Sequence, residues 1–298
     1  MENILLTGGT GFLGSNLLKR IIDKYNVILL KRSFSDLTRL EGMGGILNKG
    51  NIKLYDIDKI ALEEIFKKEK IDIVLHCATN YGRGYKDPME VITANLIMPL
   101  KLLELSRQVG VSAFINTDTI LDKGVNYYSL SKSNFKEWLN TYSNDIVCVN
   151  IANAHFYGPN DDKTKFVSFM IDQMMRKVDK IDLTAGKQKR DFIYIEDVVA
   201  GFLKVLENLK ALGKGYHHFE IGTGAQVEIK EIVLLIKELT GNNSTQLNFG
   251  ALPYRENEVM ELNIETLRLR SFGWVPKYFL REGLLNTIRE ERKQNGNG

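Results

Sequence analysis

The chain has 298 residues, 44% of them hydrophobic, which allows a sizeable core in one large domain or two small ones. Its 40 basic and 37 acidic residues nearly balance, which argues against a nucleic-acid-binding protein. The two cysteines, Cys77 and Cys148, predict a reducing compartment, and no zinc-ligand spacing is present. No signal peptide or membrane-spanning run is visible, so we expect a cytoplasmic protein.

Short apolar runs alternate with amphipathic stretches through the first half of the chain. The alternation is typical of a Rossmann-like, doubly wound parallel α/β sheet with helices on both faces. The runs that predict strands are residues 3–7, 26–31, 51–55, 71–77, 113–117 and 146–151. The stretches that predict helices are residues 12–25, 61–69, 89–109 and 127–142.

The alternation loosens after Tyr157. Helices are predicted at residues 166–178, 197–210 and 229–240, with short strands between them. No low-complexity linker separates the halves, so we expect the second to pack closely on the first. The final stretch, "RKQNGNG", is predicted to fray.

The first predicted strand leads into a glycine-rich turn and a helix, in "ILLTGGTGFLGSNLLKR". Gly8, Gly11 and Gly14 have the spacing that lets backbone N–H groups approach a pyrophosphate at a helix N-terminus. Phe12 and Leu13, which open the helix, belong to the same predicted site. A glycine triplet alone is weak, but its place at the first strand–helix turn predicts a dinucleotide cofactor.

The end of the second predicted strand, "VILLKRSFSDL", bears on the choice of dinucleotide. NAD-binding proteins usually carry an acidic residue there for the ribose 2′-hydroxyl, whereas Lys31 and Arg32 occupy the place here, with Ser33 close by. Cations attract a 2′-phosphate, so NADP(H) is favoured over NAD(H). Two solvated loop cations are the alternative, and Asp36 remains within reach of the ribose.

A hydroxyl, a phenol and an ammonium follow in "INTDTILDKGVNYYSLSKSNF". Tyr128 and Lys132 are four residues apart, hence on one face of the predicted helix. We expect the Lys132 ammonium and an oxidised nicotinamide ring to lower the pKa of the phenol, so that Tyr128 exchanges a proton with a substrate oxygen. Thr117, at a strand end, can hydrogen-bond the same oxygen. Taken alone, the spacing also occurs by chance on protein surfaces.

Together, "TGGTGFLG" and "YYSLSK" resemble the extended short-chain dehydrogenase/reductase superfamily, in its branch that acts on nucleotide sugars. The resemblance covers almost the whole chain. It implies that Thr117, Tyr128 and Lys132 are catalytic and that Lys132 also binds the nicotinamide ribose. It further implies that "LYDIDK" contacts adenine through Asp56 and Ile57, and that Ala78 in "VLHCAT" packs against the cofactor.

The resemblance also implies a nucleotide-sugar site. Arg190 in "KRDFIYIEDVV" and Arg255 in "PYRENEVM" would grip the phosphates, and guanidinium groups suit that task. Without the resemblance each would be read as a surface arginine. His155, where the family usually has Asn, either contacts the sugar or is a core histidine. Asp118 is expected to position a sugar hydroxyl.

Within this branch, the dehydratases resemble one another in having Asp and Glu directly after the catalytic Thr. Here Thr119 replaces the Glu, so elimination is disfavoured. "NTDTILDKG" and "HFYGPNDDKTKF" are similar to a small group of 4-keto-6-deoxyhexose reductases that includes the CDP-abequose synthases. The resemblance therefore implies NADPH-dependent reduction of the C4 ketone of a CDP- or dTDP-linked 4-keto-6-deoxyhexose, for surface polysaccharides such as O-antigen. The alternatives are a nucleotide-sugar 4-epimerase with tightly held NAD and a non-catalytic dinucleotide-binding protein.

The expected organisation is a dinucleotide-binding domain of residues 1–155, to which residues 188–225 return. Residues 156–187 and 226–298 then form a smaller α+β region that binds the nucleotide sugar. The family often dimerises through two helices, and a homodimer is expected here; burial against the chain's own sheet is the alternative. The apolar residues that suggest the dimer are Leu96, Leu100, Leu103, Phe135, Trp138 and Leu139.

Overall fold

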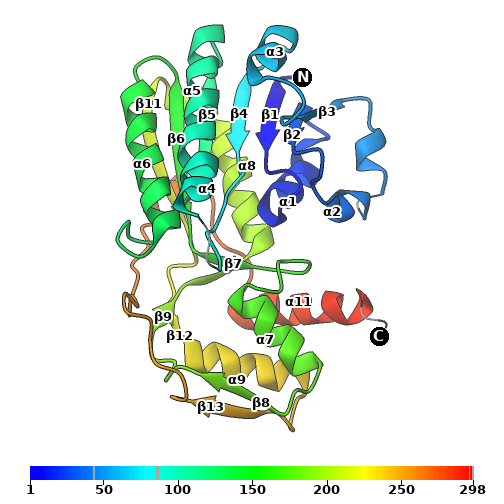
Figure 1. Cartoon of the computed structure of the whole chain (residues 1–298), viewed down its shortest axis with the longest axis vertical. Helices are drawn as coiled ribbons and strands as arrows, with labels where there is room; N and C mark the ends of the chain where they lie inside the picture. The colour runs from blue at the N-terminus through cyan, green and yellow to red at the C-terminus, as the bar shows by residue number, and fades with distance from the viewer. Residues whose placement is uncertain (43, 85–86, 295, 297–298) are drawn as a thin grey trace.

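A parallel sheet forms the larger part of the computed structural model, which describes residues 1–42, 44–84, 87–294 and 296 (Figure 1). Within these residues the seven-stranded sheet has the order β11-β6-β5-β4-β1-β2-β3, and every neighbouring pair is parallel. The strands are β1 (Asn3–Thr7), β2 (Asn26–Lys31), β3 (Ile52–Asp56), β4 (Ile73–His76), β5 (Ala113–Thr119), β6 (Val147–Asn153) and β11 (Gly215–Ile221). The predicted doubly wound fold is confirmed.

Helices cover both faces of this sheet (Figure 1). Helices α1 (Phe12–Ile21) and α8 (Ile195–Leu212) pack together on one face, above a core that continues into the rest of the molecule. Helices α3 (Leu62–Lys68), α5 (Met98–Val109) and α6 (Tyr127–Tyr142) cover the other face and bury a separate core. Burial on both faces explains why the strands read as continuous apolar runs.

The smaller part of the molecule lies beyond the carboxyl ends of these strands (Figure 1). It contains three short two-stranded pairings besides its helices, and it packs closely on the sheet through one continuous core. Its pairs are β7 (His155–Tyr157) with β10 (Phe192–Tyr194), β9 (Lys189–Arg190) with β12 (Val227–Glu228), and β8 (Lys180–Leu183) with β13 (Gln246–Phe249). Its helices are α7 (Phe166–Met175), α9 (Ile229–Thr240), α10 (Leu267–Arg270) and α11 (Leu280–Gln294).

Two predicted helical stretches differ from the structure. The expected helix 89–109 is divided into α4 (Pro88–Ile92), a π-helical turn at Thr93–Ile97, and α5. Pro99 explains the interruption, because it has no N–H to donate to the carbonyl four residues earlier. The expected fraying of residues 292–298 is wrong for its first three, since α11 continues to Gln294; residues 295, 297 and 298 lie outside the described chain. Two further short helical segments are α2 (Thr38–Glu41) and the 3-10 turn Ile46–Asn48.

A row of polar side chains crosses the sheet at one level. His76, Asn116, Asn150 and His218 are register partners on four successive strands, and Thr7 extends the row onto β1. The Thr7 hydroxyl lies 2.8 Å from His76 Nδ1, and Asn116 Nδ2 donates to Asn150 Oδ1 at 2.7 Å. We refer to these five residues as the polar row.

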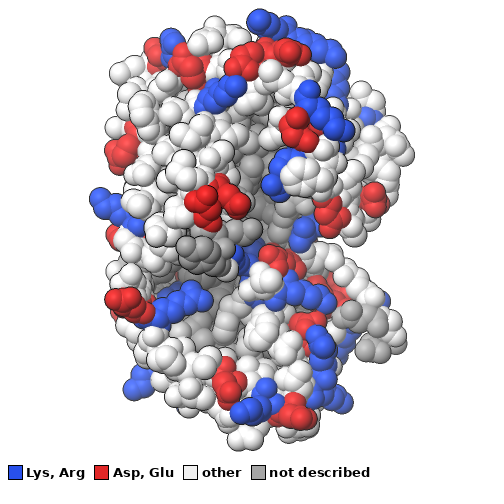
Figure 2. Space-filling model, in the orientation of Figure 1, with Lys and Arg blue, Asp and Glu red and all other residues white. Residues whose placement is uncertain are grey.

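The charge distribution agrees with the composition. Basic and acidic side chains are interspersed over the face seen in Figure 2, which is hollowed between the two parts of the molecule. None of the helices in the described residues is long and apolar enough to span a membrane.

Candidate active site

The glycine turn between β1 and α1 is built around close backbone approach. Gly8 has φ +68°, and a Cβ there would lie 2.5 Å from the Ala78 backbone nitrogen. A Cβ on Gly14 would lie 2.2 Å from the Gly8 carbonyl oxygen, which also accepts a 2.9 Å hydrogen bond from Gly11 N. Side chains at these positions would push the turn open, so glycine is required. The N-terminus of α1 is thereby left facing open space, where it favours an anion.

A cavity of about 1370 Å³ extends from this turn to Tyr128. The cavity joins the glycine turn, the ends of β2 and β5, and the start of α6. A space with this extent and volume can hold an extended dinucleotide beside a second ligand. The residues present therefore fit the predicted cofactor. Of the predicted site residues, it is lined by Gly8, Gly11, Phe12, Leu13, Gly14, Lys31, Arg32, Ile57, Ala78, Thr117, Asp118 and Tyr128.

The end of β2 is less positive than the sequence predicted. The Lys31 ammonium forms an ion pair with Asp56, and both backbone N and hydroxyl of Ser33 donate to Asp58, at 2.7 and 2.6 Å. Ser33 and Asp56 are not among the described residues that line the cavity. Lys31 lines the cavity but is paired with Asp56, the last residue of β3, and Ser33 is bonded to Asp58 just beyond it.

Two other cations stand at this end of the cavity. Arg32 is exposed and its guanidinium lies 4.8 Å from the centre of the Phe34 ring. Arg39, which the sequence analysis did not single out, lines the cavity and donates from Nε to the Asn160 carbonyl at 3.1 Å. Asp36 instead accepts hydrogen bonds from the backbone and hydroxyl of Thr38.

Thr117 and Tyr128 line the same cavity, and Lys132 is hydrogen-bonded to Thr117 behind it. Lys132 is 1% exposed, and its ammonium donates a 2.8 Å hydrogen bond to the Thr117 carbonyl. Helix α6 begins just before Tyr128 because Asn126 caps it, accepting from Ser129 N at 2.9 Å while Ser129 Oγ accepts from Asn126 N. The cap sets the start of the helix turn that carries the phenol and the ammonium.

The ionisation of this set differs from the expectation. Burial raises the pKa of the Tyr128 phenol well above its usual value, with Tyr81 and Asp118 acting in the same direction. Burial lowers the pKa of Lys132 to about 8, although Asp118 opposes the change. The predicted lowering of the Tyr128 pKa is thus not seen in this structure, because loss of solvent around the phenol outweighs nearby positive charge. Tyr128 is a protonated phenol at neutral pH.

Asp118 is held in a fixed orientation beside these groups. One carboxylate oxygen accepts from Thr119 N at 2.8 Å and the other from Asn150 Nδ2 at 2.7 Å. Asn150 belongs to the polar row, and its Nδ2 also lies 3.2 Å from His218 Nδ1. The row therefore orients a carboxylate at the catalytic end of the cavity.

The predicted substrate residues lie in the smaller part of the molecule. Arg190 is buried and forms an ion pair with Glu258, close enough to the exposed Arg255 for the two charges to interact. His155 Nδ1 is buried without a hydrogen-bond partner among the described residues. Burial, and to a lesser extent the positive charge of Arg190, lowers the pKa of His155 to about 4. His155, Arg190 and Arg255 thus cluster, but none of them belongs to the described lining of the large cavity.

An ion pair in the cavity wall was missed by the sequence analysis. Lys165 Nζ lies 2.8 Å from Asp161, and within 5.0, 4.6 and 5.6 Å of the ring centres of Phe12, Phe156 and Tyr81. Both charged side chains are largely buried, 15% and 1% exposed. The four-residue spacing of Asp161 and Lys165 in "DDKTK" did not indicate this site, because two of the three rings come from distant parts of the chain.

Comparison with known proteins identifies the class. Residues 4–222 match the NAD dependent epimerase/dehydratase family, and the chain belongs to this family. Enzymes of this family act on sugar nucleotides and bind NAD-type cofactors.

Particular relatives cover almost the whole chain. CDP-abequose synthase of Salmonella muenchen is 33% identical over 95% of this chain and 96% of its own length. dTDP-D-glucose 4,6-dehydratase of Mus musculus is 27% identical over 98% of this chain and 89% of its own. Among solved structures, UDP-glucose 4-epimerase of Thermotoga maritima with UDP-glucose superposes with a TM-score of 0.83 at 26% identity, covering 98% of this chain and 99% of that one.

Proposed function

We propose that the protein reduces the C4 ketone of a CDP- or dTDP-linked 4-keto-6-deoxyhexose with NADPH, for surface polysaccharide biosynthesis. The observation that carries this proposal is that Thr117 and Tyr128 line one dinucleotide-sized cavity and that Lys132 is hydrogen-bonded to Thr117. Similarity to a CDP-abequose synthase over nearly the full length supports a deoxysugar nucleotide as the substrate class.

The protonation state of the site suits a reduction. When bound, the reduced nicotinamide supplies a hydride to the C4 carbon. Tyr128, kept protonated by burial, donates its proton to the emerging alkoxide, and Thr117 orients that oxygen. Lys132 holds the nicotinamide ribose and contributes positive charge beside the phenol. Asp118, fixed by Asn150, positions a sugar hydroxyl.

The choice of NADPH rests on Arg32 and Arg39, since Lys31 is neutralised by Asp56. Either guanidinium suits a 2′-phosphate, because it offers several N–H donors in one plane. Arg190 and Arg255 are the proposed contacts to the sugar nucleotide's phosphates, and His155 to its sugar. In this proposal residues 1–155 and 188–225 bind the cofactor, and residues 156–187 and 226–298 bind the sugar nucleotide, in the cytoplasm.

A 4-epimerase that retains NAD is the second candidate. The structural similarity to the Thermotoga maritima 4-epimerase favours it. The same Thr–Tyr–Lys set could remove and return the proton of the sugar hydroxyl while a retained cofactor would take up the hydride and return it to the opposite face. A non-catalytic dinucleotide-binding protein is the third, and it has no need of a buried Lys132 beside Tyr128.

One experiment separates the three candidates. The purified protein is incubated with CDP-, dTDP- and GDP-linked 4-keto-6-deoxyhexoses and with the corresponding 4-hydroxy sugar nucleotides, with and without NADPH, and products are identified by NMR. We expect one keto sugar to be reduced with stoichiometric NADPH consumption. Conversion of a hydroxy sugar without added NADPH, by protein carrying co-purified NAD, establishes the epimerase instead. Cofactor binding without turnover of any sugar establishes the third candidate.

We also propose a homodimer, whose interface residues differ in part from those expected from the sequence. Leu103, Phe135 and Leu139 are buried in the chain's own core, so these predicted interface residues do not face a partner. Trp138, on α6, remains 43% exposed, and Ile97, in the π-helical turn, remains 52% exposed. A second copy of this chain would cover these two. Sedimentation of the wild type and of Trp138→Glu tests it.

A further inference from the structure

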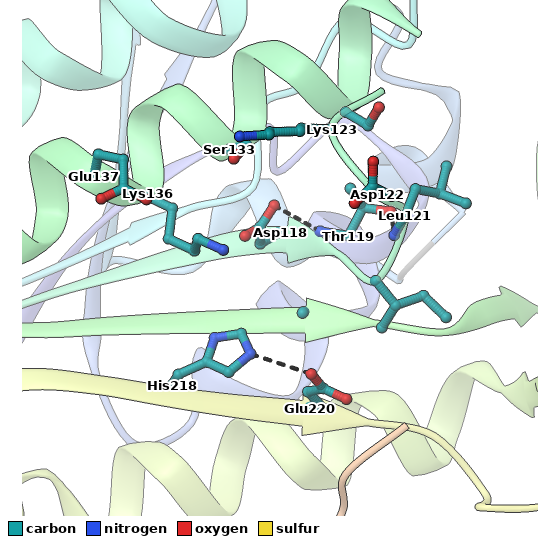
Figure 3. A pocket seen from close by; sticks show the side chains of 13 residues that line it. Asp118, Thr119, Leu121, Asp122, Lys123, Ser133, Lys136, Glu137, His218 and Glu220 are labelled. Atoms are coloured by element: carbon teal, nitrogen blue, oxygen red, sulfur yellow. Dashed lines mark hydrogen bonds and ion pairs between the residues drawn. The ribbon is translucent and has the colours of Figure 1, made fainter. Parts of the chain in front are cut away.

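A second, smaller pocket opens between helix α6 and β11, the edge strand of the sheet (Figure 3). Its volume is about 390 Å³, and its lining includes Asp118 of β5 together with His218 and Glu220 of β11. We call this space the outer pocket. Asp118 also lines the catalytic cavity, so the two spaces share one carboxylate. The His218 side chain is 35% exposed, and solvent therefore reaches it through the outer pocket.

The polar row connects His218 with Asp118 through a single amide. Asn150 Oδ1 accepts from Asn116 Nδ2 at 2.7 Å, which leaves Asn150 Nδ2 for the other two neighbours. Nδ2 donates to Asp118 Oδ2 at 2.7 Å and lies 3.2 Å from His218 Nδ1. An amide nitrogen donates two hydrogen bonds and accepts none. His218 Nδ1 must therefore be the acceptor in this contact and carry no hydrogen.

The other ring nitrogen of His218 agrees with this assignment. A neutral imidazole with a bare Nδ1 carries its hydrogen on Nε2. Nε2 lies 3.3 Å from Glu220 Oε1, which can accept that hydrogen bond (Figure 3). Glu220 Oε2 accepts from Glu265 N at 2.7 Å, so the carboxylate is itself held in place. Donors and acceptors therefore match from Glu220 to Asp118 only while His218 is neutral.

We propose that neutral His218 is a positioning residue, which acts through Asn150 to hold the Asp118 carboxylate in the orientation that binds a sugar hydroxyl. The sugar contact rests on the proposed function, whereas the tautomer of His218 does not. A proton on Nδ1 would set two N–H groups against each other, so the imidazole or the amide would turn away. Asp118 would keep its 2.8 Å hydrogen bond from Thr119 N but lose the one from Asn150. We therefore expect weaker sugar binding with little change in hydride transfer.

Solvent in the outer pocket can supply this proton, because an imidazole ordinarily titrates between about pH 5 and 8. Arg268 of α10 donates to the His218 carbonyl at 3.1 Å. The charged groups that share the outer pocket with His218 have both signs, and they are Glu220 of β11, Asp118 of β5, Asp122 and Lys123 after β5, and Lys136 and Glu137 of α6. Because other acidic groups are close by, variants rather than pH alone must assign an acid effect to His218.

The neighbouring His217 provides a matched control. Successive residues of a strand point to opposite faces of the sheet. His217 Nε2 lies 3.1 Å from the Gly213 carbonyl, and its Nδ1 lies 2.9 Å from Arg268 Nη2. His217→Asn thus removes an imidazole from the same strand without touching Asn150. His218→Asn keeps an acceptor close to the place of Nδ1 but cannot be protonated, whereas His218→Phe removes the acceptor.

The first test measures KM and kcat with NADPH and the keto sugar found by the substrate panel. The wild-type KM for the sugar should rise about fivefold from about pH 8 to about pH 5.5, and His217→Asn should follow it. His218→Asn should show less than about a twofold rise. His218→Phe should have a KM about fivefold above wild type at pH 8, with kcat within about threefold. A full acid rise in His218→Asn, no rise in the wild type, or a wild-type KM in His218→Phe overturns the proposal.

A second test needs no sugar, and it separates failure of this inference from failure of the proposed function. Long-range ¹H–¹⁵N NMR spectra of histidine-labelled protein report which imidazole nitrogen carries the hydrogen. The chain has four histidines, and the signals that are lost in His218→Asn belong to His218. We expect hydrogen on Nε2 alone at about pH 8. Hydrogen on Nδ1, or a mixture of the two tautomers, overturns the proposal even where the reductase activity is found. The expected tautomer without turnover of any keto sugar supports the contact through Asn150 and overturns the proposed function alone.

Discussion

Lys132 and Thr117 are joined by a 2.8 Å hydrogen bond from a buried ammonium to a backbone carbonyl. This bond joins the helix that carries Tyr128 to the strand end that carries Thr117. The ammonium is buried where solvent does not stabilise its positive charge, so its protonation is sensitive to pH near neutrality.

Burial lowers the pKa of Lys132 to about 8 from an ordinary value of 10.5. We expect kcat/KM for keto-sugar reduction to decline above about pH 8, as Lys132 loses its charge. The folded protein binds fewer protons than the unfolded chain between about pH 8 and 10.5, so this group makes stability rise with pH over that window. Lys132→Met should lose this alkaline limb as well as most activity; an identical limb in Lys132→Met would assign it to another group.

Tyr128 and its neighbour Tyr127 form a matched pair for mutation. Tyr128→Phe should lower the rate of NADPH oxidation at least a hundredfold, because a positioned proton donor contributes about 10²–10⁴-fold. Tyr127, 59% exposed, is the control, and Tyr127→Phe should stay within twofold of wild type. A loss below tenfold in Tyr128→Phe removes Tyr128 from the mechanism.

Arg32 should distinguish the two dinucleotides. Arg32→Ala is expected to weaken NADPH binding about tenfold, as one charge-assisted phosphate contact is lost, and to leave NADH binding nearly unchanged. Fluorescence titration with both cofactors measures this, with Arg20→Ala on α1 as a control for net charge. Equal weakening of NADH and NADPH would show that Arg32 does not recognise the 2′-phosphate.

The buried pair of Asp161 and Lys165 predicts a large stability effect. Asp161→Asn leaves the Lys165 ammonium without its counter-ion, and removing one partner of a buried pair costs about 3–5 kcal/mol. Lys24→Gln breaks an exposed pair with Glu207 and should cost less than about 1 kcal/mol. Urea denaturation of the apo protein gives both values. If the two variants unfold at similar urea concentrations, aromatic rings rather than Asp161 stabilise Lys165.

Gly14 tests the turn that faces the cofactor. Gly14→Ala places a methyl group 2.2 Å from the Gly8 carbonyl, so the turn must open and dinucleotide affinity should fall at least tenfold. Gly50→Ala is the control, because nothing lies within 4 Å of its Cβ. Isothermal titration with NADPH compares them, and equal affinities would mean that the turn tolerates side chains.

Local pattern was sufficient for much of the fold. Strands β1 and β2 begin and end at the predicted residues, because each is a continuous apolar run between polar or glycine residues. The glycine turn was predicted for the same reason, since strand, turn and helix are contiguous in the chain. The predicted class of protein is confirmed by the family match.

Long-range pairing explains what the sequence did not reveal. Asp56 and Asp58 lie 25 residues from Lys31 and Ser33, and only the pairing of β2 with β3 brings them together. The raised pKa of Tyr128 likewise depends on how completely the folded chain covers the phenol, which spacing on a helix does not report. The charge pattern at one strand end therefore did not show which of these residues already have partners in the folded chain.

The polar row has a consequence for assembly of the molecule. Side chains alternate between faces along a strand, so a one-residue slip of β5 against β6 would carry Asn116 away from Asn150 and set an unpaired amide against hydrocarbon. The apolar runs, rich in interchangeable Ile, Val and Leu, offer little discrimination between alternative alignments. These few amides and imidazoles therefore favour one register of the strands. The same register places Asp118 where Asn150 can hydrogen-bond to it.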